Sequence, residues 1–475
     1  NEAVCTLAAQ PYQPTPDYGI ADGKSGFENA KGPYALWLDV RERHLSSVEA
    51  PGIEDPALND VDTCSRAQVV WQLRMLIRGE ADRSLQVTLD ALQRRHDALD
   101  ETSDEAQQLA ELIKRFKQDG SKSLDQIFAS LGGAGDEDRT AELACEALRR
   151  ILDLRGTYAR PQLRAQLQPP ESDEDPCVIA ADARYRGCEN QLYRVEIHEG
   201  GLAAVADAAG PANTPTATFK WSRENGSVIF PIVECGTPGE PAADGSAPLT
   251  ITLAGLGRDA RLGLVVGNWV ELLDDNCTLA QRAFPLLQVV AIDVPDRSIT
   301  LGVPKNVTPY LPRTDPDKHP LLRRWDQHNE VDNQGVLSVI EETWIDLEDG
   351  VQIRFEPGGI YATGDYWLIP ARVAGNGTLE WPQEPAADGK PAAAAVQARG
   401  LHHYAVLGGV NAAGVYRECC CRFIPPCQQR LIGIGRAADR FDFPPPLRTA
   451  APPNRGVGPA RRTKPKRRTP KRKPA

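Results

Sequence analysis

The chain has 475 residues, a length that allows two to four domains, with 41% hydrophobic residues and a net charge of −11. The acidic balance argues against nucleic acid wrapping around the folded part, and no apolar run reaches the roughly 18 residues that a membrane span needs. Residues 1–10 lack the basic and apolar regions of a signal peptide. The start at Asn1, with Met75 as the single methionine, indicates a fragment or a processed chain.

The N-terminal part, residues 1–79, is predicted to be β structure with a truncated start. In the segment 33–40, Tyr34, Leu36 and Leu38 would share one face of a strand, and the segment 69–76 would provide its partner. The 40 glycines and 39 prolines of the chain suit short strands joined by many turns.

Residues 80–156 are predicted to form an α-helical insertion. Proline is almost absent there, and Leu85, Leu89 and Leu92 recur at helical spacing. We expect three or four helices in a small hairpin or bundle. Because β patterns lie on both sides, the helices are interpreted as an insertion into β structure.

Residues 157–255 are predicted to be β-rich. An acidic, proline-rich connector at 161–176 precedes a cleanly alternating segment at 191–198. The Asn225-Gly226 pair lies between two strand-like segments, 218–223 and 227–232, and predicts a β-hairpin that joins them.

Residues 256–305 are predicted to form a small barrel-like region, because strands at 267–273, 286–292 and 298–301 follow one another closely. The region 306–436 is β-rich again, with strands at 344–347, 351–355, 364–371 and 403–407. The predicted fold is therefore mainly β, with antiparallel sheets, a small barrel-like domain and an α-helical insertion, or α+β overall.

The C-terminal segment 437–475 is rich in proline, arginine and lysine and is predicted to be disordered. From Arg448 onward it carries eleven basic residues and no acidic one. Such a tail could contact nucleic acid, anionic lipid or an acidic protein surface, including the acidic body of the same chain.

The eleven cysteines are mostly scattered, a pattern typical of reduced, cytosolic thiols. The best candidate for a metal site is the set Cys419, Cys421, Cys427 and His403. Alternate residues of an extended strand face the same side, so Cys419 and Cys421 could share an ion. The favoured interpretation is a group of thiols at the end of the last strand, so no metal and no cofactor are predicted.

Two clusters could carry catalytic chemistry. Asp346, Glu348 and Asp349 could supply the acid pair of a glycosidase, but a solvated hairpin turn is the favoured interpretation. The segment 39–44 reads as a charged strand end with salt bridges. No nucleophile motif such as Gly-x-Ser-x-Gly is present. We therefore predict no catalytic residues and a protein that is not an enzyme.

Several segments together resemble one family: 34–44 (YALWLDVRERH), 183–198 (ARYRGCENQLYRVEIH), 219–230 (FKWSRENGSVIF), 267–272 (GNWVEL) and 364–371 (GDYWLIPA). The chain is similar to domain of unknown function 6519, a family of large bacterial proteins that resemble components encoded with phage-tail-like contractile injection systems. The resemblance covers roughly residues 30–80 and 157–425, and the helical stretch and the basic tail look peculiar to this chain.

This resemblance implies a non-enzymatic structural or interaction component, close to the baseplate of a tail-like particle. Its partners would be other proteins of that particle. Its location would be a cytoplasmic assembly that can be released as part of an extracellular particle. Two alternatives stay open: a secreted β protein that binds or cleaves glycans, and a zinc-stabilised binding module.

Overall fold

The computed structural model describes residues 33–50, 52, 65–114, 117, 127, 145, 148–149, 152, 159–168, 184–204, 216–259, 261–328, 330–375, 377–385, 391–410 and 416–419. All of them fall in the first of two compact units, Asn1–Pro444 and Pro445–Ala475. They form antiparallel sheets and one closed six-stranded barrel, which confirms the predicted mainly β fold. No helix within these ranges is long and apolar enough to cross a membrane. The predicted disordered tail lies outside them.

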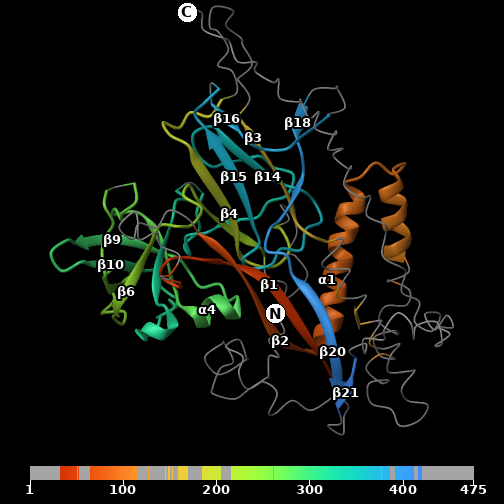
Figure 1. Ribbon diagram of the computed structural model, residues 1–475, viewed down its shortest axis with the longest axis horizontal. Coiled ribbons are helices and arrows are strands. Elements are labelled where there is room, and N and C mark those ends of the chain that lie inside the picture. Colours follow the sequence, from red (N-terminus) through yellow and green to blue (C-terminus); the bar gives the residue numbers. More distant parts are fainter. Residues whose placement is uncertain are drawn as a thin grey trace, which may run out of the picture. The chain divides into compact units, whose positions relative to one another are not determined.

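The first sheet has the strand order β2-β1-β20-β21. Its strands are β1 (Tyr34–Leu45), β2 (Arg66–Ile77), β20 (His403–Val410) and β21 (Tyr416–Glu418). β1 and β2 form one long antiparallel ribbon, and β20 lies along the other edge of β1 (Figure 1). The two predicted N-terminal strands therefore pair as expected. β1 continues five residues past its predicted end, and β2 extends beyond both of its predicted ends.

Helix α1 (Arg78–Asp97) begins directly after β2 and confirms the first helix of the predicted insertion. Leu85, Leu89 and Leu92 are buried, as their spacing predicts. Ala91 packs against apolar residues of the β structure, among them Leu202. Helical residues continue at 104–114, whereas most of 115–156 lies outside the described ranges.

Two sheets enclose the main core. One has the order β12-β5-β4-β15-β16 and the other β13-β14-β3-β19. The strands of the first are β4 (Gln191–Glu199), β5 (Thr218–Ser222), β12 (Leu337–Ser338), β15 (Tyr366–Arg372) and β16 (Thr378–Leu379). Those of the second are β3 (Gln162–Leu167), β13 (Ile345–Asp346), β14 (Val351–Phe355) and β19 (Val396–Gln397). A short ribbon comprises β17 (Gln383–Pro385) and β18 (Pro391–Ala393). Large aromatic side chains fill the core, including Tyr193, Phe219, Trp221, Phe355 and Trp367.

Strand β3 corrects one prediction, because it occupies the start of the segment 161–176 that was predicted to be a connector. Leu163 and Ala165 are fully buried, and β3 pairs with both β14 and β19. The clustered prolines and acidic residues follow only after Leu167. The composition of the second half of the segment therefore concealed a short alternating strand in the first half.

The barrel has the strand order β10-β7-β6-β11-β8-β9. Its strands are β6 (Ile229–Cys235), β7 (Ala247–Leu253), β8 (Trp269–Leu273), β9 (Leu287–Asp293), β10 (Ser298–Val303) and β11 (Leu321–Trp325). Helix α4 (Asp275–Ala280) and the 3-10 helix η6 (Pro316–Lys318) lie in its connections. The three strands predicted within 256–305 are confirmed as β8, β9 and β10, and the other three come from either side of that range.

The predicted turn at Asn225-Gly226 forms, but the predicted hairpin does not. Both residues have positive φ angles, 54° and 66°, as a tight turn of this type requires. However, β5 pairs with β4 and β12, whereas β6 pairs with β7 and β11. The turn therefore carries the chain from the five-stranded sheet into the barrel.

Candidate functional site

Strands β4 and β5 each have one apolar face and one charged face. Val195 of β4 lies in the core, and because side chains alternate along a strand, Arg194, Glu196 and His198 point to the opposite face. Lys220 of β5 does the same. None of these four charged or ionisable residues is more than 8% exposed, so the charged face is covered.

The barrel covers this face with the outer sides of β8 and β11. Val270 and Leu272 belong to the barrel interior, so Glu271 between them points outward. Arg323 and Trp325 of β11 lie on the same outer side and are buried too. The charged layer between sheet and barrel therefore contains Arg194, Glu196, His198, Lys220, Glu271 and Arg323.

Lys220 is the centre of the charged layer. Its Nζ lies 2.6 and 2.7 Å from the two carboxylate oxygens of Glu271 and 3.5 Å from Oε1 of Glu196. Arg194 Nε donates to Glu196 Oε2 at 2.5 Å. These are short, charge-assisted hydrogen bonds between buried groups, where electrostatic attraction is stronger than in water.

Two aromatic rings complete the pairing. Trp325 Nε1 donates to Glu271 Oε2 at 2.8 Å, and Lys220 Nζ lies 4.4 Å from the Trp325 ring centroid. The Arg194 guanidinium lies 3.7 Å from the Tyr366 ring centroid. Cation–π contacts of this kind stabilise charges that have lost their water.

The layer fixes the protonation state of its members. Burial alone would raise the pKa of Glu196, but Arg194, Lys220 and Arg323 outweigh burial and lower the pKa to about 2. Burial also opposes ionisation of Glu271, yet Lys220 holds its pKa below the usual value. Burial and then the charge of Lys220 lower the pKa of His198 to about 4. At neutral pH the two carboxylates are therefore ionised and this imidazole is neutral.

A cavity of about 90 Å³ borders the charged layer. Its wall includes members of the layer. It also includes residues of β1, of α4 and the segment after it, and of the segment before β20: Arg41, Arg43, His44, Cys277, Arg282 and His402. Burial, followed by Glu271 and Asp274, raises the pKa of the Cys277 thiol, so this cysteine is protonated at neutral pH.

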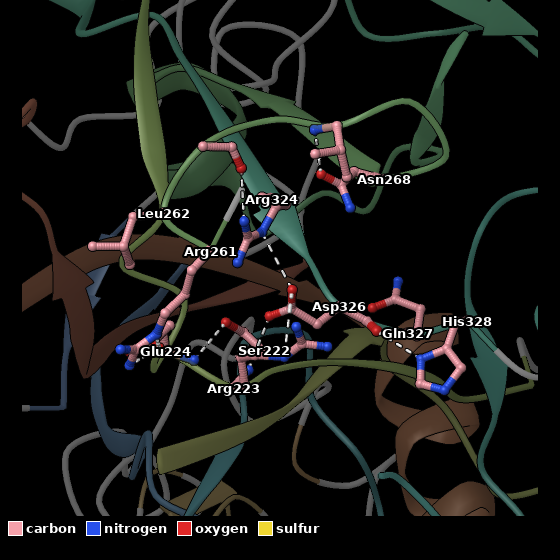
Figure 2. A network of polar contacts seen from close by, with 12 residues as sticks. Ser222, Arg223, Glu224, Arg261, Leu262, Asn268, Arg324, Asp326, Gln327 and His328 are labelled. Carbon is pink, nitrogen blue, oxygen red and sulfur yellow. Dashed lines mark hydrogen bonds and ion pairs between the residues drawn. The ribbon is translucent and has the colours of Figure 1, made fainter. Parts of the chain in front are cut away.

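A second polar network starts from the next residue of β11, Arg324 (Figure 2). Arg324 Nη1 donates to the Gly263 carbonyl at 2.7 Å, and its Nε pairs with Asp326 Oδ1 at 3.2 Å. Asp326 Oδ2 accepts the backbone N–H of Arg223 at 3.0 Å, and Glu224 in turn accepts from Arg261 Nη2 at 2.7 Å. This network ties the loop after β5 to the end of β11.

The predicted charged strand end 39–44 does form salt bridges. Asp39 accepts from Arg74 Nε at 2.9 Å and contacts His402 Nδ1 at 2.6 Å. Burial opposes ionisation of Asp39, but His402 and the nearby arginines keep its pKa below the usual value. His402 thus binds Asp39, while His403 is exposed on β20.

The cysteines depart from the expectation of reduced thiols, because Cys145 and Cys419 form a disulfide with a Cα–Cα distance of 5.4 Å. Cys419 is therefore not available as a thiolate ligand while that bond is intact. Of the other candidate ligands, Cys421 and Cys427 lie outside the described residues. Within the described ranges, no group of three or more His, Cys, Asp or Glu side chains could hold a metal ion.

The acidic segment 346–349 lies at the turn between β13 and β14, where Asp349 and Gly350 have positive φ angles of 51° and 81°. Glu348 is engaged there: it accepts from Arg223 at 2.7 and 2.9 Å and from the Tyr193 hydroxyl at 3.1 Å. Burial raises the pKa of Glu348 despite these contacts.

Sequence reasoning missed the central residues Glu196, Lys220 and Glu271. A signal was present in β4, where Arg194, Glu196 and His198 occupy every second position between apolar residues. Alternation of this kind predicts a strand with a polar face. It does not tell whether that face meets water or a second sheet.

The fold and its buried site define a mainly β protein in which a closed barrel joins a two-sheet core through a layer of paired charges. The chain belongs to a family of unknown function (DUF6519), whose model matches residues 1–473. This match spans the helical stretch and the basic tail, so the expectation that both are peculiar to this chain is wrong. No curated protein and no solved structure matches the chain.

Proposed function

We propose that the chain is a non-enzymatic structural or interaction component of a phage-tail-like contractile injection system. One observation carries the structural part: the charges buried between sheet and barrel bind one another, with Lys220 held between Glu271 and Glu196. Ion pairs of this kind hold the five-stranded sheet and the barrel together. The kind of assembly is inferred from the family resemblance.

The protonation states support a non-enzymatic role. A general acid or base works best when its pKa lies near the working pH. The pKa values of Glu196 and His198, about 2 and about 4, both lie well below neutral pH. Burial raises the pKa of the Cys277 thiol, so the reactive thiolate form is disfavoured at neutral pH.

The barrel offers a surface for contact with another protein. Val265, Val266 and Val290 are 39%, 61% and 49% exposed. The backbone N–H of Gly267 donates to the Val289 carbonyl at 2.8 Å, so the loop that carries the first two valines lies beside β9. Exposed aliphatic groups that lie together on a surface are typical of interaction sites.

The Cys145–Cys419 disulfide indicates the kind of compartment in which the protein acts. Disulfides persist in oxidising surroundings, outside the cytosol in most organisms. The Cys145–Cys419 bond therefore favours a role in a released, extracellular particle over one confined to the cytosol. We also propose that the basic tail contacts anionic surfaces.

The test is recovery of the chain with its neighbours from the native host, followed by mass spectrometry. We expect sheath, tube or baseplate proteins with the wild type and not with the double variant Val266→Glu and Val290→Glu. Val373→Glu is the matched control, because Val373 is 43% exposed outside the barrel. If no tail-like protein is recovered with the wild type, the proposal is wrong. Equal recovery with all three would move the contact away from the barrel valines.

The glycan alternative makes a different prediction. The purified protein would then degrade a polysaccharide, and this activity would be lost in Glu271→Gln and kept in Asp346→Asn. Such a result would show that a catalytic acid lies in the charged layer and would contradict a non-enzymatic role. The small size of the cavity, about 90 Å³ against the roughly 300 Å³ or more of ordinary ligand pockets, argues against a sugar there.

A further inference from the structure

Arg323 is a buried cation that forms no ion pair with any of the described residues. Its side chain lies in the charged layer and is only 7% exposed. Its Nε has no hydrogen-bond partner, and no carboxylate of the described residues lies within 4.0 Å of its guanidinium. Glu196 feels the charge of Arg323, but its short contacts go to Arg194 and Lys220.

His44 lies in the same cavity wall and is also unsatisfied. Both of its ring nitrogens are buried, and neither has a hydrogen-bond partner among the described residues. The nearby charges of Arg194 and Arg323 act on the ring. Buried polar groups are nearly always hydrogen-bonded, because an unmet donor or acceptor costs roughly 1–3 kcal/mol.

The charge of the layer does not balance. Its inner wall holds three cations and two carboxylates: Arg194, Lys220, Arg323, Glu196 and Glu271. Nearer the rim, Asp39 pairs with Arg74 and Glu49 with Arg43. Glu42 also lines the cavity, but it is exposed to solvent and its charge is offset by Arg41 in the same wall. An uncompensated buried charge is strongly unfavourable, and among the described residues this inner wall has one more positive charge than negative.

We propose that the cavity between Arg323 and His44 binds a small oxyanion, which supplies the missing charge and accepts hydrogen bonds from both side chains. Its volume of about 90 Å³ exceeds the roughly 10–15 Å³ that a single buried water needs. This space can hold sulfate, phosphate or a single short carboxylate.

The first test measures the melting temperature of the full chain against sulfate or phosphate at constant ionic strength, with chloride as the balancing anion. Binding to the folded state raises the melting temperature by roughly 3–8 °C at a hundredfold excess over Kd. Sulfate also stabilises proteins in general, and the basic tail attracts anions. A rise in the melting temperature of the wild type alone therefore does not identify binding in the cavity. The comparison is with Arg323→Met, and Arg258→Met on the exposed barrel surface is its matched control.

We expect the oxyanion shift in the wild type and in Arg258→Met, and its loss in Arg323→Met. Equal shifts in all three would overturn the proposal. If Arg323→Met does not fold, the site can be tested in crystals of the wild type soaked in selenate. Selenium can be located in such crystals by its anomalous scattering. A selenium peak within hydrogen-bond distance of Arg323 and His44 supports the site. Density for water or chloride alone in that cavity overturns it.

Discussion

Lys220 of β5 and Glu271 of β8 belong to different sheets, yet the lysine Nζ lies 2.6 and 2.7 Å from the two oxygens of the carboxylate. Their side chains are 5% and 7% exposed. The pair therefore joins the five-stranded sheet to the barrel at a place where an aliphatic contact would be expected. Removal of one partner and removal of both should have different consequences.

We predict that Lys220→Met lowers the free energy of unfolding by about 3–5 kcal/mol, because it leaves Glu271 and Glu196 buried without their shared cation. Urea or guanidinium unfolding of the full chain measures this loss. Replacing both partners, Lys220→Met with Glu271→Leu, should recover much of it, because no charge is then stranded. The exposed Lys305→Met is the control. A cost for Lys220→Met as small as that of the control would contradict the central role of Lys220.

We predict that stability falls as the pH drops from 7 to 5, in part because of His198. Unfolded histidine takes up a proton near pH 6.5, whereas His198 in the folded chain does so only near its lowered pKa of about 4. Between these values the unfolded state binds more protons, so acid favours unfolding. The contribution of this residue is about 2 kcal/mol over the interval. The neutral His44 acts in the same direction.

The measurement is the free energy of unfolding of wild type and His198→Gln at pH 7 and pH 5. The pH dependence of the variant should be smaller by about 2 kcal/mol, whereas that of His403→Gln, an exposed position on β20, should be unchanged. Identical pH profiles for wild type and His198→Gln would show that His198 is not held neutral by its surroundings.

Local patterns predicted much of the fold, because they report the periodicity of single elements. Alternation identified β1 and β4, and leucine spacing identified α1. Local patterns failed where the outcome depends on a distant partner. The Asn225-Gly226 turn was predicted correctly, but the sheets that receive its two flanking strands depend on contacts far along the chain.

The candidate site was hidden for the same reason. The alternation of Arg194 and Glu196 with apolar residues indicates a polar face of a strand but not what covers that face. Only the arrival of β8 and β11 buries them together. The disulfide was hidden as well, since 274 residues separate its two cysteines and no local motif links them.

We predict that Gly358→Ala destabilises the chain more than Gly267→Ala does. Both glycines have positive φ angles, 81° and 97°, so alanine is strained at either position. A Cβ at Gly358 would also lie 2.5 Å from the Cβ of Arg95 and 2.6 Å from the Ala91 carbonyl on α1, whereas nothing lies within 4 Å at Gly267. The excess, about 1–3 kcal/mol by denaturant unfolding, reports how closely α1 docks on the β structure. Equal losses would mean that α1 can move aside freely.

The last prediction concerns the Cys145–Cys419 disulfide, which ties the helical stretch to the end of β21. Digestion of unreduced protein should yield one linked peptide that contains both cysteines. The double variant Cys145→Ser and Cys419→Ser should lose about 2–4 kcal/mol of stability under oxidising conditions, because the unfolded chain is no longer constrained. A reducing agent should destabilise the wild type and leave the double variant unchanged. Cys188→Ser, at an exposed free thiol, should behave as wild type in both assays. Recovery of Cys145 and Cys419 as free thiols from unreduced, folded protein would refute the link and restore Cys419 as a candidate metal ligand.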